Sequence, residues 1–94
     1  MALKKSVGGK VITVGNNVEL ITAASCNLPA STSYIELKCF YIKNEEETKA
    51  IEISINGGTG LVLNPGEFFD LSNLVNVCSC KCIKGGKLRW GGMA

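Results

Sequence analysis

Short runs of β-branched and aromatic residues, interrupted every few positions by Gly, Asn or Pro, restrict most strongly how this chain can fold. The runs predict strands, and the intervening residues predict turns because they tolerate positive φ or fix φ. No ten-residue window combines helical periodicity with capping residues. We therefore expect an all-β chain, a small antiparallel β-sandwich or barrel of about seven to eight short strands, with the sandwich favoured. The predicted strands cover residues 11–14, 18–21, 34–43, 50–55, 61–63, 68–71, 75–83 and 87–90.

Three of the intervening segments predict specific turns. Gly15-Asn16-Asn17 is expected to close a hairpin between the first two strands. Residues 56–60, which contain three glycines, are expected to close a second hairpin between 50–55 and 61–63. Residues 64–67, Asn-Pro-Gly-Glu, fit a type II turn, with Pro at the second position and Gly at the third, where φ is positive.

The alternation within residues 34–43 predicts which side chains share a face. Both faces become apolar towards the end of this run, which indicates a central strand covered on two sides there. In 50–55 the isoleucines are expected to point inward, with Glu52 and Ser54 outward. On the longer strand, one predicted face holds Ile35, Leu37, Cys39 and Tyr41, and the other holds Glu36, Lys38, Phe40 and Ile42.

The chain of 94 residues predicts one domain, residues 1–94, with a basic N-terminal segment at 1–10 and a short tail at 91–94. A domain this small buries only about two-thirds of its unfolded surface, so association with other subunits is expected. No apolar run approaches the roughly 20 residues of a membrane span, and the first residues lack the apolar core of a signal peptide. We expect a protein that is neither exported nor membrane-bound, with its five cysteines reduced.

Charge is distributed unevenly along the chain. Residues 1–10 carry three lysines and residues 81–94 carry four basic residues, whereas the segment between them carries three lysines and eight carboxylates. This asymmetry is compatible with head-to-tail contacts between copies, with attraction to a polyanion, or with a closed fold in which the termini lie beside acidic strands.

No residue pattern in the sequence indicates catalysis. The chain has no histidine, which removes the usual general base and the Ser-His and Cys-His nucleophile pairs. The three consecutive glutamates at 45–47 lie in a predicted loop and are expected to be solvated. The glycines at 57–60 lack the Lys-Ser/Thr and the helix of a phosphate loop. We predict a protein that is not an enzyme and that has no cofactor.

Cys78-Ser-Cys80-Lys-Cys82 invites a metal-site interpretation, since thiolates bind zinc. Zinc knuckles place two residues between paired cysteines, whereas this alternating pattern on a strand places three thiols along one face. Small buried hydrophobic side chains are the simpler explanation, and the same is expected of Cys26 and Cys39. No metal site is predicted.

A basic stretch at Lys81, Lys84, Lys87 and Arg89 lies beside Trp90 and suggests a surface for single-stranded nucleic acid. Alternation, however, places Leu88 and Trp90 opposite Lys87 and Arg89, so the indole is expected in the core. A cytosolic nucleic-acid-binding or ligand-binding β-barrel stays open as an alternative function.

Four segments follow one another between residues 41 and 90: Tyr41-Ile-Lys-Asn44, Ala50-Ile-Glu-Ile-Ser-Ile-Asn-Gly57, Leu63-Asn-Pro-Gly-Glu67 and Ile83-Lys-Gly-Gly-Lys-Leu-Arg-Trp90. In this order of strands and turns, residues 34–90 resemble small β-sandwich structural proteins of tailed phages and prophages. It implies a virion protein assembled in the host cytoplasm, chiefly a capsid decoration protein that stabilises the shell by binding the major capsid protein and its own copies as a homo-oligomer, with a trimer favoured. A head fibre or a small tail or neck component is the related alternative.

The expected partner contacts lie in the two basic ends, in the loop at 25–33 and in the tail. They are Lys4, Lys5, Lys10, Leu28, Pro29, Lys84, Lys87, Arg89 and Met93.

Overall fold

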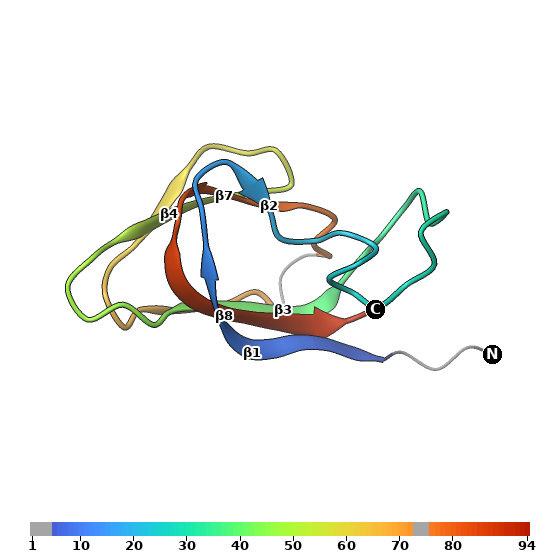
Figure 1. Cartoon of the computed structure of the whole chain (residues 1–94), viewed down its shortest axis with the longest axis horizontal. Helices are drawn as coiled ribbons and strands as arrows, with labels where there is room; N and C mark the ends of the chain where they lie inside the picture. The colour runs from blue at the N-terminus through green and yellow to red at the C-terminus, as the bar shows by residue number, and fades with distance from the viewer. Residues whose placement is uncertain (1–4, 73–75) are drawn as a thin grey trace.

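The computed structural model describes residues 5–72 and 76–94, and that part of the chain is all-β, without a helix (Figure 1). The predicted antiparallel β-sandwich is confirmed. Its eight strands are β1 (Ser6–Val14), β2 (Val18–Glu19), β3 (Lys38–Asn44), β4 (Ile51–Ile55), β5 (Leu61–Leu63), β6 (Phe68–Asp70), β7 (Cys80–Lys84) and β8 (Gly86–Met93).

The strands form two antiparallel sheets that pack face to face. One sheet has the order β1-β8-β3-β6 and the other the order β2-β7-β4-β5. The pairs β1–β8, β2–β7, β3–β6 and β4–β5 are nested, as though one long hairpin had been rolled up. In Figure 1 the sheet containing β8 and β3 forms the lower layer and the sheet containing β2, β7 and β4 the upper one. This strand order is that of a jelly roll.

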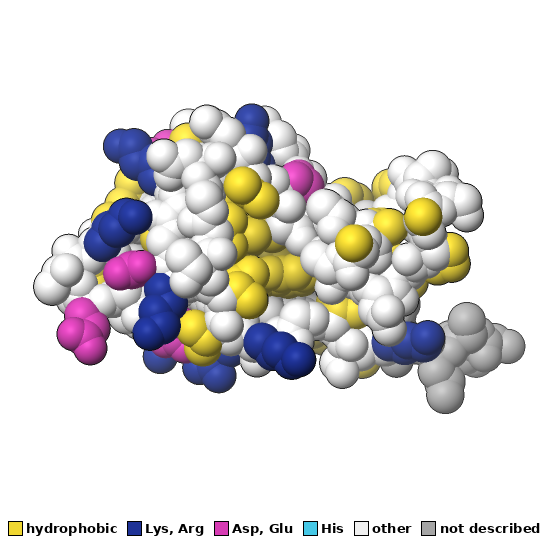
Figure 2. All heavy atoms as spheres, viewed as in Figure 1, with side chains coloured by type: hydrophobic (Ala, Val, Ile, Leu, Met, Phe, Trp, Pro, Cys, Tyr) yellow, Lys and Arg dark blue, Asp and Glu magenta, His cyan; other side chains and the backbone are white. Residues whose placement is uncertain are grey.

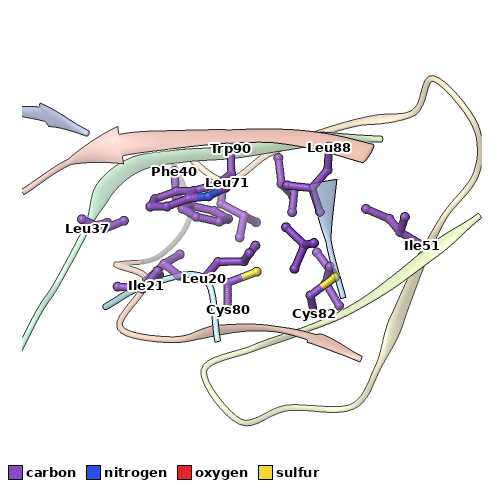
Figure 3. Close-up of a cluster of buried hydrophobic side chains, with 14 of the residues drawn as sticks. Leu20, Ile21, Leu37, Phe40, Ile51, Leu71, Cys80, Cys82, Leu88 and Trp90 are labelled. Atoms are coloured by element: carbon purple, nitrogen blue, oxygen red, sulfur yellow. The ribbon is translucent and has the colours of Figure 1, made fainter. Parts of the chain in front are cut away.

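The core lies between the two layers and is closely packed with apolar side chains. Trp90 of β8 is only 3% exposed, and its ring stacks on Phe40 of β3 with centroids 6.2 Å apart. Cys80 and Cys82 point into the same core from β7 (Figure 3). The inward orientation of Trp90 and the packing role of these two cysteines are therefore as predicted. Burial of each large apolar side chain in this core stabilises the folded state by about 1.5–3 kcal/mol.

The predicted hairpin between residues 11–14 and 18–21 is wrong. β1 lies in one sheet and β2 in the other, so the segment from Gly15 to Asn17 arches across the edge of the sandwich. Asn17 does adopt positive φ, at 58°, and the side-chain oxygen of Asn16 accepts a hydrogen bond from the backbone N–H of Gly85 at 2.8 Å. The turn is local, but β1 and β2 find their partners in β8 and β7, far along the chain.

The second hairpin and the type II turn are confirmed. β4 pairs with β5 in a register that places Ile51 opposite Leu63. In the turn that follows, Gly66 has φ of 77°, and the N–H of Glu67 donates to the carbonyl of Asn64 at 2.9 Å. That bond and the positive φ at the third position define the type II geometry.

The strand predicted at 34–43 begins at Lys38, and its first part departs from simple alternation. Cys39 adopts φ of 56° at a bulge, where the register with β8 shifts. The bulge places Leu37 and Phe40 on the same inner face and turns Cys39 outward. The predicted face of Ile35, Leu37, Cys39 and Tyr41 is therefore wrong, as is the core position of Cys39.

In the other strands the structure differs from the prediction mainly at the strand ends. Ile51 and Ile53 are buried as expected, but Ser54 is buried too, since its hydroxyl donates to the carbonyl of Gly58 at 2.7 Å. The strand predicted at 75–83 is observed as β7 from Cys80, and position 75 lies outside the described residues.

Both segments expected at the chain ends are parts of paired strands. Residues 6–10 belong to β1 and residues 91–93 to β8. Beyond these strands the backbones of Lys5 and Ala94 exchange two hydrogen bonds of 2.8 Å. Gly91 allows this end to close tightly, because a Cβ there would lie 2.7 Å from the hydroxyl oxygen of Tyr41.

Candidate functional site

The predicted contact residues lie in separate regions of the sandwich. Lys5, Met93 and the loop with Leu28 lie at the end of the sandwich where Lys5 pairs with Ala94, at the right of Figure 1. We call this the terminal end, comprising Lys5, residues 20–36, Met93 and Ala94. Lys10 lies partway along β1, whereas Lys84, Lys87 and Arg89 lie towards the other end of the sheets. Lys4 is outside the described residues.

A pocket of about 350 Å³ opens at the terminal end. It is lined by Leu28, Tyr34, Ile35, Glu36 and Ala94, so the loop and the last residue form one surface. Tyr34 is 67% exposed and presents its ring beside this pocket. The lining is as polar as it is apolar, so the pocket suits a partner side chain that has both an apolar part and a polar group.

The hydroxyl of Tyr34 is held by two neighbours. It donates to Glu36 Oε2 at 2.8 Å and lies 3.4 Å from the Sγ of Cys78. The hydrogen bond with Cys78, and then that with Glu36, raises the pKa of this phenol well above its ordinary value. These two contacts orient the Tyr34 hydroxyl towards Glu36 and Cys78.

Hydrogen bonds between Thr22 and Ser25 build the loop that carries Leu28 and Pro29. The N–H of Thr22 donates to Ser25 Oγ at 2.9 Å, and the N–H of Ser25 donates to Thr22 Oγ1 at 3.0 Å. The N–H of Cys26 donates to the carbonyl of Thr22, and the Cys26 side chain is buried. These contacts give the loop a compact form, in which Pro29 is exposed and Leu28 is half-buried.

The two basic residues of β8 differ, because the Arg89 side chain is paired and the Lys87 side chain is exposed. Arg89 makes an ion pair with Glu45 at 3.2 Å, and Lys43 approaches the same carboxylate at 3.2 Å. Lys87 donates its backbone N–H to Glu46 Oε2 at 2.6 Å. Trp90 is buried between the sheets and cannot serve as the predicted aromatic platform, although Phe68, opposite Lys43 in the sheet, is exposed and stacks on Tyr41 with centroids 5.7 Å apart.

The two long edges of the sandwich carry apolar side chains that sequence reasoning did not identify. Along one edge, formed by β5 and β6, Val62 is 58% and Phe68 54% exposed. Along the other, formed by β1 and β2, Val11 is 47% exposed. The available signal is that β5 and β6 have three residues each, because such short strands usually lie at sheet edges.

Chemically reactive groups are few in the part of the chain that the structure describes. Within residues 5–72 and 76–94, no three His, Cys, Asp or Glu side chains gather as a metal site would require. Burial raises the pKa of the Cys80 and Cys82 thiols, so these sulfurs stay protonated. No helix in the same ranges is long and apolar enough to cross a membrane.

The fold and the surfaces define a small jelly roll with exposed edges and a pocketed terminal end. Comparison of the chain with family models, with curated proteins and with solved structures gave no match.

Proposed function

We propose that this protein is a non-enzymatic structural component of a phage or prophage virion, a capsid decoration protein that binds the major capsid protein and its own copies. The observation that carries the proposal is the terminal end. Leu28 and Ala94, two elements expected to contact a partner, line one pocket there beside the exposed Tyr34. The jelly roll supports the proposal by analogy, since many viral capsid proteins share it.

In this proposal the terminal end docks on the capsid. A side chain of the capsid protein that has an apolar part and a polar group fills the pocket, and Tyr34 lines one side of it. Lys5, exposed at the same end, adds attraction to carboxylates on the shell. Decoration at capsomer junctions adds buried interface and so resists the outward pressure of the packaged DNA.

The direct test is cryo-electron microscopy of particles that contain the chain. Density for the jelly roll on the capsid surface, with residues 20–36 facing the shell, is the expected result. Density confined to the tail or neck would replace decoration with the related alternative of a tail component. Absence of the chain from purified particles by mass spectrometry would overturn the virion assignment altogether.

A binding assay with capsids that lack the chain tests the docking end separately. Leu28→Asp places a charge in the pocket and is expected to weaken capsid binding at least about tenfold. Thr48→Asp is the matched control, because Thr48 is exposed in the loop between β3 and β4 and lies outside the terminal end. Equal binding by both variants would contradict docking through the terminal end.

Against a nucleic-acid-binding barrel, Arg89 is paired with Glu45 and Trp90 is buried, although the side chains of Lys84 and Lys87 are exposed. Salt-sensitive binding of an oligonucleotide that is lost in Lys84→Ala would revive it.

A further inference from the structure

The two long edges of the sandwich differ in charge. Between Leu61 and Ser72 the ionisable side chains are Glu67 and Asp70, both acidic. Asp70 accepts a hydrogen bond from the N–H of Ser72, which lowers the pKa of its carboxyl and keeps it ionised. We call the edge formed by β5 and β6 the acidic edge. Its exposed apolar side chains are Leu61, Val62 and Phe68.

The opposite edge, formed by β1 and β2, carries positive charge. Lys5 and Lys10 are exposed along it, and the carboxylate of Glu19 is turned away to accept hydrogen bonds from Ile21 and Cys80. We call this the basic edge. Its exposed apolar side chains are Val11, Ile12 and Val18.

Each edge also opens into a groove between the two sheets. On the acidic edge the groove is about 180 Å³ and is lined by Leu61, Leu63, Phe69 and their neighbours, with Glu67 among them. On the basic edge it is about 330 Å³ and is lined by Gly8, Lys10, Ile12, Ser25 and Trp90. Figure 2, which views the molecule with β1 and β2 in front, shows hydrophobic side chains in the hollow between the layers.

Strand direction makes the two edges complementary. Each sheet has four strands, and every neighbouring pair is antiparallel, so the two edge strands of a sheet run in opposite directions. A second copy related by simple translation therefore sets its β1 antiparallel to β6 of the first, and its β2 antiparallel to β5. Both sheets would continue across the contact with the hydrogen-bond pattern they already have.

We infer that copies of this protein associate head to tail, with the acidic edge of one copy against the basic edge of the next. Apolar side chains on both edges are covered, and Glu67 and Asp70 face the lysines of the neighbour. An acidic edge against a second acidic edge would bring like charges together, which disfavours the two-fold arrangement. The inference rests on the self-association in the proposed function and identifies the surfaces that carry it.

Two single variants and their mixture test this arrangement by light scattering. Val62→Lys on the acidic edge and Val11→Glu on the basic edge each place an unfavourable charge in the contact. Each alone is expected to raise the apparent dissociation constant at least about tenfold, because a head-to-tail contact needs both edges. Thr48→Lys, at an exposed residue of the loop between β3 and β4 and in neither edge strand, is expected to associate like the unmodified protein.

The mixture gives the sharper result. Val62→Lys keeps an intact basic edge and Val11→Glu an intact acidic edge, so an equimolar mixture should recover at least a 1:1 pair, twice the chain mass of 10.0 kDa. If only one variant weakened association, or if mixing recovered nothing while both stayed folded by circular dichroism, head-to-tail contact would be wrong. A monomeric unmodified protein would overturn it too, whereas capsid binding through the terminal end would still be measurable.

Discussion

The terminal end and the opposite end of the sandwich are held together in different ways. We call the latter the corner end, comprising Val14 to Asn16, Asn44 to Glu46 and Lys84 to Lys87. There, buried amides and close backbone contacts join the two sheets. At the terminal end, by contrast, a loop closed by local hydrogen bonds leaves a pocket open. Substitutions at the corner end should therefore affect stability most, and those at the terminal end should affect binding.

The largest effect is expected for Gly85→Ala. A Cβ at this position would overlap the carbonyl oxygens of Val14 and Gly15, which are backbone atoms that cannot move aside cheaply. The substitution should destabilise the fold by about 3 kcal/mol or more. Urea unfolding followed by circular dichroism measures the loss.

Gly15→Ala is the matched control, because a Cβ there would lie 4.0 Å from the nearest side-chain atom, on Val18. If Gly85→Ala and Gly15→Ala lowered the free energy of unfolding by the same amount, close packing at Gly85 would not be what joins the sheets.

Asn44→Ala should have the next largest effect. The buried side chain donates to the carbonyls of Lys49 and Leu63 at 2.9 Å and accepts from the N–H of Glu46 at 2.8 Å. Its removal leaves these groups without partners and should cost about 2–3 kcal/mol in the free energy of unfolding. Asn64→Ala, at an exposed asparagine, should lower the free energy of unfolding by less than about 0.5 kcal/mol. Equal losses for the two substitutions would show that the Asn44 hydrogen bonds do not stabilise the corner end.

Ser25→Ala tests the loop of the terminal end. Ser25 Oγ accepts from the N–H of Thr22 and donates to the carbonyl of Leu20 at 2.6 Å. Because the site is partly exposed and water can replace the hydroxyl, we expect a loss of about 1 kcal/mol in thermal unfolding experiments. A loss as large as that of Asn44→Ala would remove the distinction between the two ends.

Tyr34→Phe should have the smallest effect on stability, below about 0.5 kcal/mol, because the ring is exposed and keeps its place beside the pocket. Calorimetry of both proteins measures the difference. A marked drop in melting temperature would mean that the hydrogen bonds with Glu36 and Cys78 hold the terminal end together.

Local features of the fold were predictable from the sequence, and long-range ones were not. The turn at Pro65 and Gly66 depends on four neighbouring residues, and the burial of Trp90 depends on alternation within one strand. The turn predicted from Gly15 and Asn17 is also present in the structure. Whether the strands beside that turn pair with each other is decided by β7 and β8, more than sixty residues away along the chain.

The misassigned face of residues 34–43 has a different cause. Alternation assumes an unbroken strand, and the bulge at Cys39 shifts the pattern by one position. The exposed apolar side chains of β5 and β6 escaped prediction because three-residue strands are too short for alternation to separate inward from outward side chains. Of the proposed contacts, the grouping of Leu28 with Ala94 likewise depends on the pairing of β1 with β8, which only the fold reveals.

The nested order of the strands has a consequence for how the chain acquires its structure during synthesis. β4 and β5 are close in sequence and can pair as soon as both leave the ribosome. Sheet β1-β8-β3-β6 needs β8 between β1 and β3, so β1 has no partner until β8 has been translated. Until that point, the exposed valine and isoleucine side chains of β1 lie in an unpaired strand. Completion of this fold therefore depends on the synthesis of β8 and is slow for its size, and high concentrations of nascent chains favour aggregation.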